Sequence, residues 1–258
     1  MRHIKRNAEI EIARGNTPGA SVFGGLGERE SMAVVVTGED IWRGNELTPA
    51  PTSHTTIPTP SALGEQMTVV SENANDTSAG TGVRTLEIHF IDEAGNAQVE
   101  TVTMNGTTPV NTVSTKIRFV NHMNTKTVGT NTVAAGHIKI YKTGSVGLVY
   151  SMIAKGGNMS LVSNRMVPRG HTLILTGWHG TEAQGKRVAL RVRSTDMDGV
   201  LLPGVFTFKD TVYLNKTSSG HMDDAIKIPA FSIVKISGWG DATGAEVSVA
   251  WSGILFED

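Results

Sequence analysis

Hydrophobic and polar residues alternate along much of the chain, and this pattern predicts strands. The stretch 84–92 has leucine, isoleucine and phenylalanine at every second position, with polar side chains between them. Such a period of two is typical of a strand with one buried face. A turn at 93–96 and a second alternating stretch at 98–104 complete a predicted hairpin. Further predicted strands lie at 116–121, 137–141, 147–153, 159–162, 172–178, 187–193, 205–214, 225–228, 233–239 and 245–256.

Short strands separated by Gly, Asn and Pro are typical of β-sandwiches. No segment has a convincing helical period; 107–115 is compatible with either a short helix or an extended link. We therefore predict an all-β fold, in which two β-sandwich-like modules follow an extended N-terminal arm. A turn-like Thr143-Gly144-Ser145 suggests a domain boundary. The predicted domains are an arm and linker at 1–65, a first module at 66–143 and a second at 144–258, with one continuous sandwich as the alternative.

The predicted arm is rich in Pro and Gly but also contains apolar side chains. Four prolines between 48 and 60 disfavour both helix and central strand, and one short strand is expected at 32–36. The apolar side chains of this region are costly to leave in water. A flexible arm is the simpler interpretation. We expect instead that the arm orders against a neighbouring subunit and forms an assembly interface through Val34, Val35, Val36, Ile41 and Trp42.

A row of arginines is predicted on the 187–193 strand. Val188, Leu190 and Val192 occupy the alternate, core-facing positions. The opposite face then carries Arg187, Arg191 and Arg193. This face is either solvated or a subunit contact, because guanidinium groups pair with carboxylates through two hydrogen bonds and are common at interfaces. We include the three arginines in the predicted assembly interface.

Composition and charge narrow the classes of function. The formal net charge is −1, which gives no electrostatic reason to bind nucleic acid. Cysteine is absent, so disulfides, thiolate metal sites and a cysteine nucleophile are excluded. No stretch has the length and apolarity of a membrane span or a signal peptide. We therefore expect a protein made in the cytoplasm, with neither nucleic acid nor membrane as a partner.

Candidate chemistry is sparse. The histidines lack the spacings of metal sites, and the chain has no nucleophile elbow and no phosphate-binding loop in a strand-to-helix context. The acidic pairs, such as Glu39-Asp40, are expected to be solvated. We predict a non-enzymatic protein with no catalytic, metal-binding or cofactor-binding residues. Trp178 and Trp239 stand at predicted strand ends, where they either pack locally or stack on sugars, as in a lectin-like module.

Several short segments resemble structural proteins of tailed-phage virions, of the head decoration, head-fibre or tail accessory type. They are Asp40–Gly44, Met67–Ser71, Asn75–Thr77, Gly80–Arg84, Glu100–Thr108, Met166–Gly170 and Lys235–Gly238. The resemblance implies a virion protein that attaches to the phage capsid or tail and decorates or stabilises it. It also implies a homo-oligomer, most often a trimer, with the major capsid protein or tail or portal-proximal proteins as partners. The alternative is a receptor-binding, lectin-like phage module that recognises host surface glycan.

Overall fold

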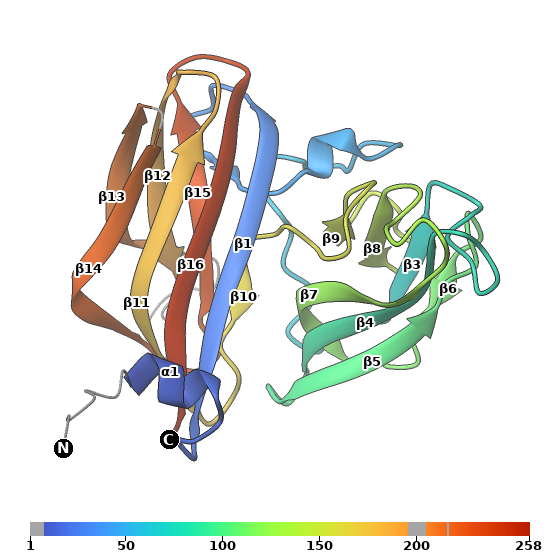
Figure 1. Cartoon of the computed structure of the whole chain (residues 1–258), viewed down its shortest axis with the longest axis horizontal. Helices are drawn as coiled ribbons and strands as arrows, with labels where there is room; N and C mark the ends of the chain where they lie inside the picture. Colours follow the sequence, from blue (N-terminus) through green and yellow to red (C-terminus); the bar gives the residue numbers. More distant parts are fainter. Residues whose placement is uncertain (1–7, 196–204, 216) are drawn as a thin grey trace, which may run out of the picture.

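A computed structural model describes residues 8–195, 205–215 and 217–258, and these residues form a nearly all-β protein. The strands belong to four small antiparallel sheets, here called A to D (Figure 1). The all-β prediction is confirmed. A short helix α1 (Ala8–Ala13) and a 3-10 turn η1 (Gly44–Glu46) are the helical elements of the described part. No helix within it is long and apolar enough to cross a membrane.

Sheets A and B pack face to face. Their inward-facing side chains, among them Leu175, Leu190 and Val249, form one buried core, so we call this pair the AB sandwich. Sheet A has the order β1 (Ala20–Met32), β16 (Ala245–Glu257), β11 (His171–Glu182), β14 (Thr217–Ile228). Sheet B has the order β10 (Arg165–Met166), β15 (Ile233–Gly240), β12 (Arg187–Ser194), β13 (Thr207–Asn215), and β2 (Glu39–Asp40) also pairs with β15.

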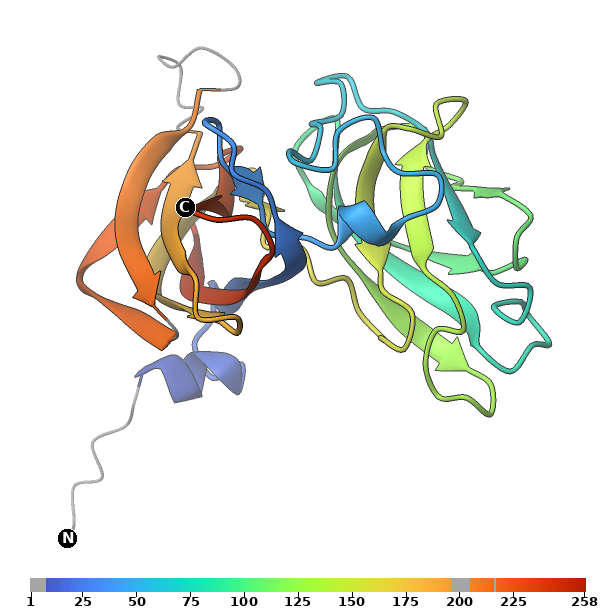
Figure 2. The same cartoon turned by 90° about the horizontal axis from the view of Figure 1, so that it is seen from above.

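Sheets C and D enclose a second core, which contains Leu86, Met123 and Ile140, and we call this pair the CD sandwich. Sheet C has the order β5 (Ala97–Thr103), β4 (Val83–Asp92), β7 (Ile117–Val128). Sheet D has the order β6 (Val110–Asn111), β3 (Met67–Ser71), β8 (Ile138–Lys142), β9 (Val149–Ile153). The segment 107–115, for which the sequence allowed either a short helix or an extended link, contains the short strand β6 and no helix. The two sandwiches lie side by side (Figures 1 and 2).

The chain enters the AB sandwich, leaves it for the CD sandwich and then returns. The predicted domain bounds 1–65, 66–143 and 144–258 are therefore wrong in two places. First, β8 and β9 form one hairpin of sheet D, and Thr143-Gly144-Ser145 is its turn rather than a boundary. Second, β1 and β2 belong to the same sandwich as the C-terminal third. Gly144 has φ of 80°, a conformation that turns favour and that by itself does not separate domains.

The predicted extended arm at 1–65 is contradicted by β1, which pairs with β16 along most of its length. Residues 1–7 lie outside the described part. Strand β1 contains Gly24, Gly25 and Gly27, which lower strand propensity and concealed it in the sequence. The glycines allow close approach: a Cβ on Gly25 would lie 2.6 Å from Nε1 of Trp251 and 2.8 Å from the Ser163 carbonyl oxygen. A strand was expected at 32–36, but β1 ends at Met32 and residues 33–36 are not in a strand.

The link between the sandwiches places consecutive residues in different cores. Ile41 is fully buried in the AB core, and Trp42 is fully buried in a cluster against the outer face of sheet D. Leu47 and Ile57 join that cluster, so the Pro-rich segment covers sheet D, as the blue segment in Figure 2 shows. The prediction that Ile41 and Trp42 reach a neighbouring subunit is wrong. Their apolar surface is removed from water within their own chain, which satisfies the same hydrophobic requirement.

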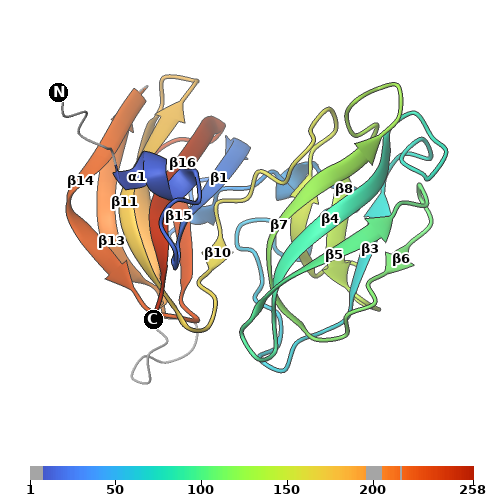
Figure 3. The ribbon, with the colours of Figure 1, turned by 60° about the horizontal axis from the view of Figure 1, so that its bottom comes forward.

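Direct contacts also join the sandwiches. Ile91 and Phe119 of sheet C pack with Met166 and Ile233 of sheet B. The side-chain amide of Asn121 on β7 accepts a hydrogen bond from the Met166 main-chain nitrogen (2.8 Å) and donates one to the Met166 carbonyl (3.3 Å). Asn121 thus imitates a strand partner for β10, which faces β7 in Figure 3.

Candidate interaction surface

The outer face of sheet B carries the predicted row of arginines. On β12, Val188, Leu190 and Val192 are buried in the AB core, as predicted. Because side chains of a strand alternate between its faces, Arg187, Arg191 and Arg193 lie on the opposite face. Arg187 is exposed, whereas Arg191 and Arg193 are partly buried.

Aromatic rings from both neighbouring strands contact Arg191 and Arg193. The Trp239 ring on β15 has the Arg191 guanidinium 4.3 Å from its centroid and that of Arg193 at 5.0 Å. Arg191 also lies 4.9 Å from the Phe208 ring of β13, and Phe208 meets Trp239 edge-on at 6.0 Å. Cation–π contacts of this kind hold the guanidinium groups against the aromatic rings.

Arg193 is anchored more firmly than its two neighbours. Its side chain is only 14% exposed and pairs with the buried carboxylate of Asp40 at 3.5 Å. It also donates a hydrogen bond to the Ser237 hydroxyl (2.5 Å) and lies over the Phe206 ring. Burial lowers the pKa of Arg193, and the Asp40 carboxylate opposes this effect. Arg193 is therefore part of the framework beneath the surface, while Arg187 and Arg191 are available to a partner.

The segment after β1 reaches the same face. The Trp239 indole donates a hydrogen bond to the Val36 carbonyl (3.0 Å), and a Cβ on Gly38 would lie 2.4 Å from the Trp239 ring. The Val36 side chain is 98% exposed and Val34 is 56% exposed, while Val35 is partly buried. The fold thus brings together two sets of predicted interface residues, the valines and the arginines, with Trp239 between them.

Phe208 and Tyr213 complete this surface. Phe208 is 57% exposed and Tyr213 is 76% exposed; Tyr213 and Trp239 pair with Ala189 from opposite sides of β12. Exposed apolar side chains next to arginines are typical of protein-binding surfaces. We call the following set the sheet B surface: Val34, Val36, Arg187, Arg191, Phe208, Tyr213 and Trp239. The sequence predicted a strand at 205–214, but it held no sign that β13 and β15 flank β12.

Trp178 and the acidic pair Glu39-Asp40 are buried and do not belong to the sheet B surface. Trp178, expected at a strand end, is 3% exposed and donates a hydrogen bond to Asp210 (2.8 Å). The pair Glu39-Asp40, expected in solvent, is buried: Glu39 makes two hydrogen bonds with Arg29, at 2.5 and 3.1 Å, and Asp40 pairs with Lys235 at 2.8 Å. Lys235, the partner of Asp40, is far away in the sequence. Arg29, the partner of Glu39, is nearer, but the sequence gives no reason to expect that it forms this pair.

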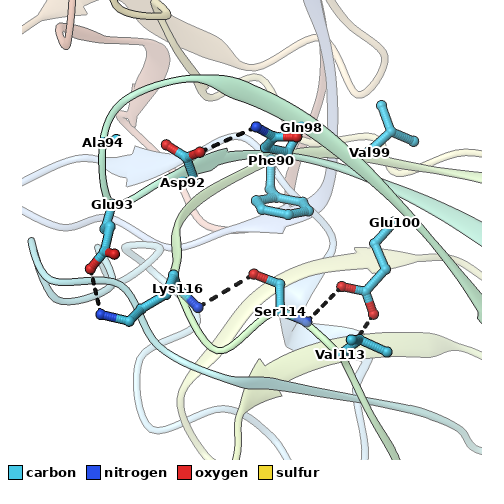
Figure 4. Close-up of a pocket in the computed structure, with 10 residues that line it drawn as sticks. All are labelled: Phe90, Asp92, Glu93, Ala94, Gln98, Val99, Glu100, Val113, Ser114 and Lys116. Atoms are coloured by element: carbon cyan, nitrogen blue, oxygen red, sulfur yellow. Dashed lines mark hydrogen bonds and ion pairs between the residues drawn. The ribbon is translucent and has the colours of Figure 1, made fainter.

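A depression of about 520 Å³ lies beside the β4–β5 hairpin (Figure 4). Its polar groups mostly bond with one another: Glu100 accepts hydrogen bonds from the main-chain nitrogens of Val113 (2.6 Å) and Ser114 (3.0 Å). Lys116 pairs with Glu93 at 2.5 Å. These contacts fix the loop 113–116 against the hairpin and indicate a structural role.

Within the described residues, no three His, Cys, Asp or Glu side chains lie close enough together to hold a metal ion. Comparison with protein-family models, curated proteins and solved structures gives no match to this chain.

Proposed function

We propose that this protein is a non-enzymatic structural component of a tailed-phage virion, which attaches to the capsid or tail through the sheet B surface. The observation that carries the proposal is that exposed Phe208 and Tyr213 lie on one face of sheet B with Arg191, which packs on Trp239. Aromatic residues and arginine are enriched among the side chains that dominate protein–protein affinity. The short-segment resemblance to virion proteins supports the choice of partner, the major capsid protein or a tail or portal-proximal protein.

The expected partner surface is acidic with an apolar centre. Arg187 and Arg191 offer guanidinium forks that match carboxylates. The Phe208 and Tyr213 rings, with Val34 and Val36 at the edge, offer apolar area. Together they favour a protein surface in which carboxylates surround apolar side chains.

Binding of purified protein to virions that lack it tests the proposal. We expect Arg191→Glu and Tyr213→Ala each to weaken co-sedimentation with such particles by roughly tenfold or more. Lys155→Glu is the matched control for the charge change, because Lys155 is exposed on the CD sandwich, and it should bind normally. Unchanged binding by both sheet B variants, with folding intact, would exclude this surface as the attachment site.

Glycan recognition is the second candidate, favoured by the exposed Phe208 and Tyr213 rings. Trp178 gives it no support because it is buried, and the Trp239 ring is already contacted by Gly38 and Arg191. A glycan array read with the native chain and with Tyr213→Ala separates the candidates. Binding to host glycans that is lost in the variant would favour the receptor-binding function.

Self-association as a trimer stays a prediction based on the resemblance. Burial of Ile41 and Trp42 in their own chain removes the energetic argument that the sequence offered for it. Light scattering on purified protein measures the oligomeric state directly, and a monomer at high concentration would contradict the prediction.

A further inference from the structure

A cleft between the two sandwiches lies away from the sheet B surface. Two adjoining pockets of about 350 and 380 Å³ share Val22, Phe23 and Gly24 of β1, His122 of β7 and Arg165 of β10. Because they share lining residues from both sandwiches, we treat them as one interdomain cleft. Ligand sites are frequent at such domain interfaces, and pockets of this size accommodate small molecules.

The cleft contains a buried cation, Arg165, that has no counter-ion among the described residues. Arg165 is 4% exposed, and its Nη1 donates hydrogen bonds to the carbonyls of Val162 and Asn164, both at 2.8 Å. Among the described residues no carboxylate forms an ion pair with Arg165, and its Nε and Nη2 donate no hydrogen bond. Burial lowers the pKa of Arg165 to about 10, so it stays charged at neutral pH. A buried, uncompensated guanidinium is costly, and a carboxylate is its best-matched partner.

The titratable side chains near Arg165 do not neutralise its positive charge. His122 stacks on His89, with ring centroids 4.0 Å apart, and burial followed by the charge of Arg165 lowers the pKa of His122 to about 3. His122 is therefore neutral at neutral pH. Glu87, the acid beside His89, pairs with Lys126 at 2.8 Å on the surface of sheet C. The positive charge of the cleft thus comes from Arg165.

The remaining walls are mainly apolar. Phe23 packs edge-on against Trp251, with centroids 5.9 Å apart, and Phe90 and Leu255 line the same cleft. Val22 and Val99, which also line it, are 55% and 56% exposed. A ligand that covered them would remove apolar area from water as well as neutralise Arg165.

We propose that the interdomain cleft binds a small organic carboxylate with an apolar body. Its carboxylate pairs with the Nε–Nη2 edge of Arg165, and its body lies against Phe23 and Val22. This site is separate from the sheet B surface and does not depend on the proposed attachment to virions.

Benzoate is the probe that tests the site, followed through the NMR signals of the imidazole rings of His89 and His122 in the full chain. We expect a saturable shift with benzoate, and binding weaker by about tenfold or more with the neutral analogue benzyl alcohol and with inorganic phosphate. Arg165→Lys keeps the charge but loses the fork, and should weaken benzoate binding to a similar extent.

Since Arg165→Lys alters a buried position, Val22→Trp provides an independent test at an exposed one. The larger side chain should fill the cleft and abolish benzoate binding, whereas Val113→Trp, at an 89% exposed position outside the cleft, should not. The proposal is overturned if benzoate gives no saturable shift, if phosphate binds as well as benzoate, or if Val22→Trp binds benzoate like the native chain.

Discussion

Asp40 joins segments that are far apart in the sequence. Its carboxylate accepts hydrogen bonds from the Ile57 main-chain nitrogen (3.0 Å) and the Ser237 hydroxyl (2.9 Å), and it pairs with Lys235 at 2.8 Å. Lys235 is 3% exposed, and burial lowers its pKa while Asp40 opposes that effect. Asp40 also contacts Arg193, so the same carboxylate supports the framework of the sheet B surface.

Replacing Asp40 should be strongly destabilising. Asp40→Asn leaves Lys235 buried without a counter-ion, and we expect the free energy of unfolding to fall by about 3–5 kcal/mol in denaturant titrations. Adding Lys235→Met should recover part of this loss, because it removes one uncompensated charge, whereas Arg193 still lacks the Asp40 carboxylate. Asp241→Asn, at an exposed position, is the control and should change stability by about 0.5 kcal/mol or less. An Asp40→Asn chain as stable as the native one would contradict the prediction.

The buried histidine predicts a pH dependence of stability. His122 has a pKa of about 3 in the folded chain, because of burial, the charge of Arg165 and the neighbouring His89. In the unfolded chain its pKa is about 6.5. Between these values the unfolded state binds a proton that the folded state does not, so the contribution of His122 to stability is lost as the pH falls. Glu87 and Lys126, which pair beside His89, complete the charged surroundings.

We expect His122→Asn to reduce the fall in unfolding free energy between about pH 6.5 and pH 4 relative to the native chain. Denaturant titrations at several pH values measure the slope. An NMR titration of the His122 ring is the direct check, since the ring should stay neutral over this range in the folded chain. Protonation of the ring near pH 6.5 would refute the assignment.

At the scale of elements, β1 depends on its glycines. A Cβ on Gly25 would meet the Trp251 indole nitrogen, which donates a hydrogen bond to the Ser163 carbonyl at 2.7 Å. We expect Gly25→Ala to lower the free energy of unfolding by about 1–3 kcal/mol through overpacking and loss of that bond. Ser21→Ala, at an exposed position of the same strand, should have little effect. Urea unfolding followed by Trp fluorescence measures both, and a Gly25→Ala chain of native stability would show that β1 can shift without cost.

The same strand shows where sequence patterns stop being informative. Alternation located most strands, including β4, β12 and β16, because each has one face in a core. Strand β1 was missed because Gly24 and Gly25 are required by Trp251, more than two hundred positions later in the chain. A local pattern does not contain that information. Strand β8 was located, but the boundary placed after it was wrong, because a hairpin turn and a domain boundary have similar composition.

For the candidate site, the pattern identified the strand but not its surroundings. The outward row of Arg187, Arg191 and Arg193 follows from alternation on β12 alone. The roles of Phe208 and Trp239 depend on the order β15-β12-β13, which is a tertiary property. Arg165 illustrates the same limit, since its place in the cleft, with no carboxylate partner in the described part of the chain, becomes visible only when β10 is placed beside β7.

At the scale of the whole molecule, the two sandwiches are coupled through several independent contacts. Ile41 anchors the link in the AB core, Trp42 anchors it in the cluster against the outer face of sheet D, and Phe119 packs between the sandwiches. At the tip of the β4–β5 hairpin, the Phe231 ring lies so close to Gly95 that a Cβ there would be 2.1 Å from it. Loss of either sandwich would therefore expose buried apolar area of the other.

This coupling predicts that the native chain unfolds in one cooperative transition, with equal calorimetric and van't Hoff enthalpies in scanning calorimetry. Phe119→Ala removes a side chain that is 5% exposed and lies in the contact between the sandwiches. It should weaken that contact by about 3–5 kcal/mol and separate the transition into two. Phe256→Ala, at a position 38% exposed on β16, is the control and should retain one transition. Two resolved transitions in the native chain would mean that the AB and CD sandwiches fold independently, and the contacts through Phe119, Asn121 and Trp42 would then orient the sandwiches without linking their stability.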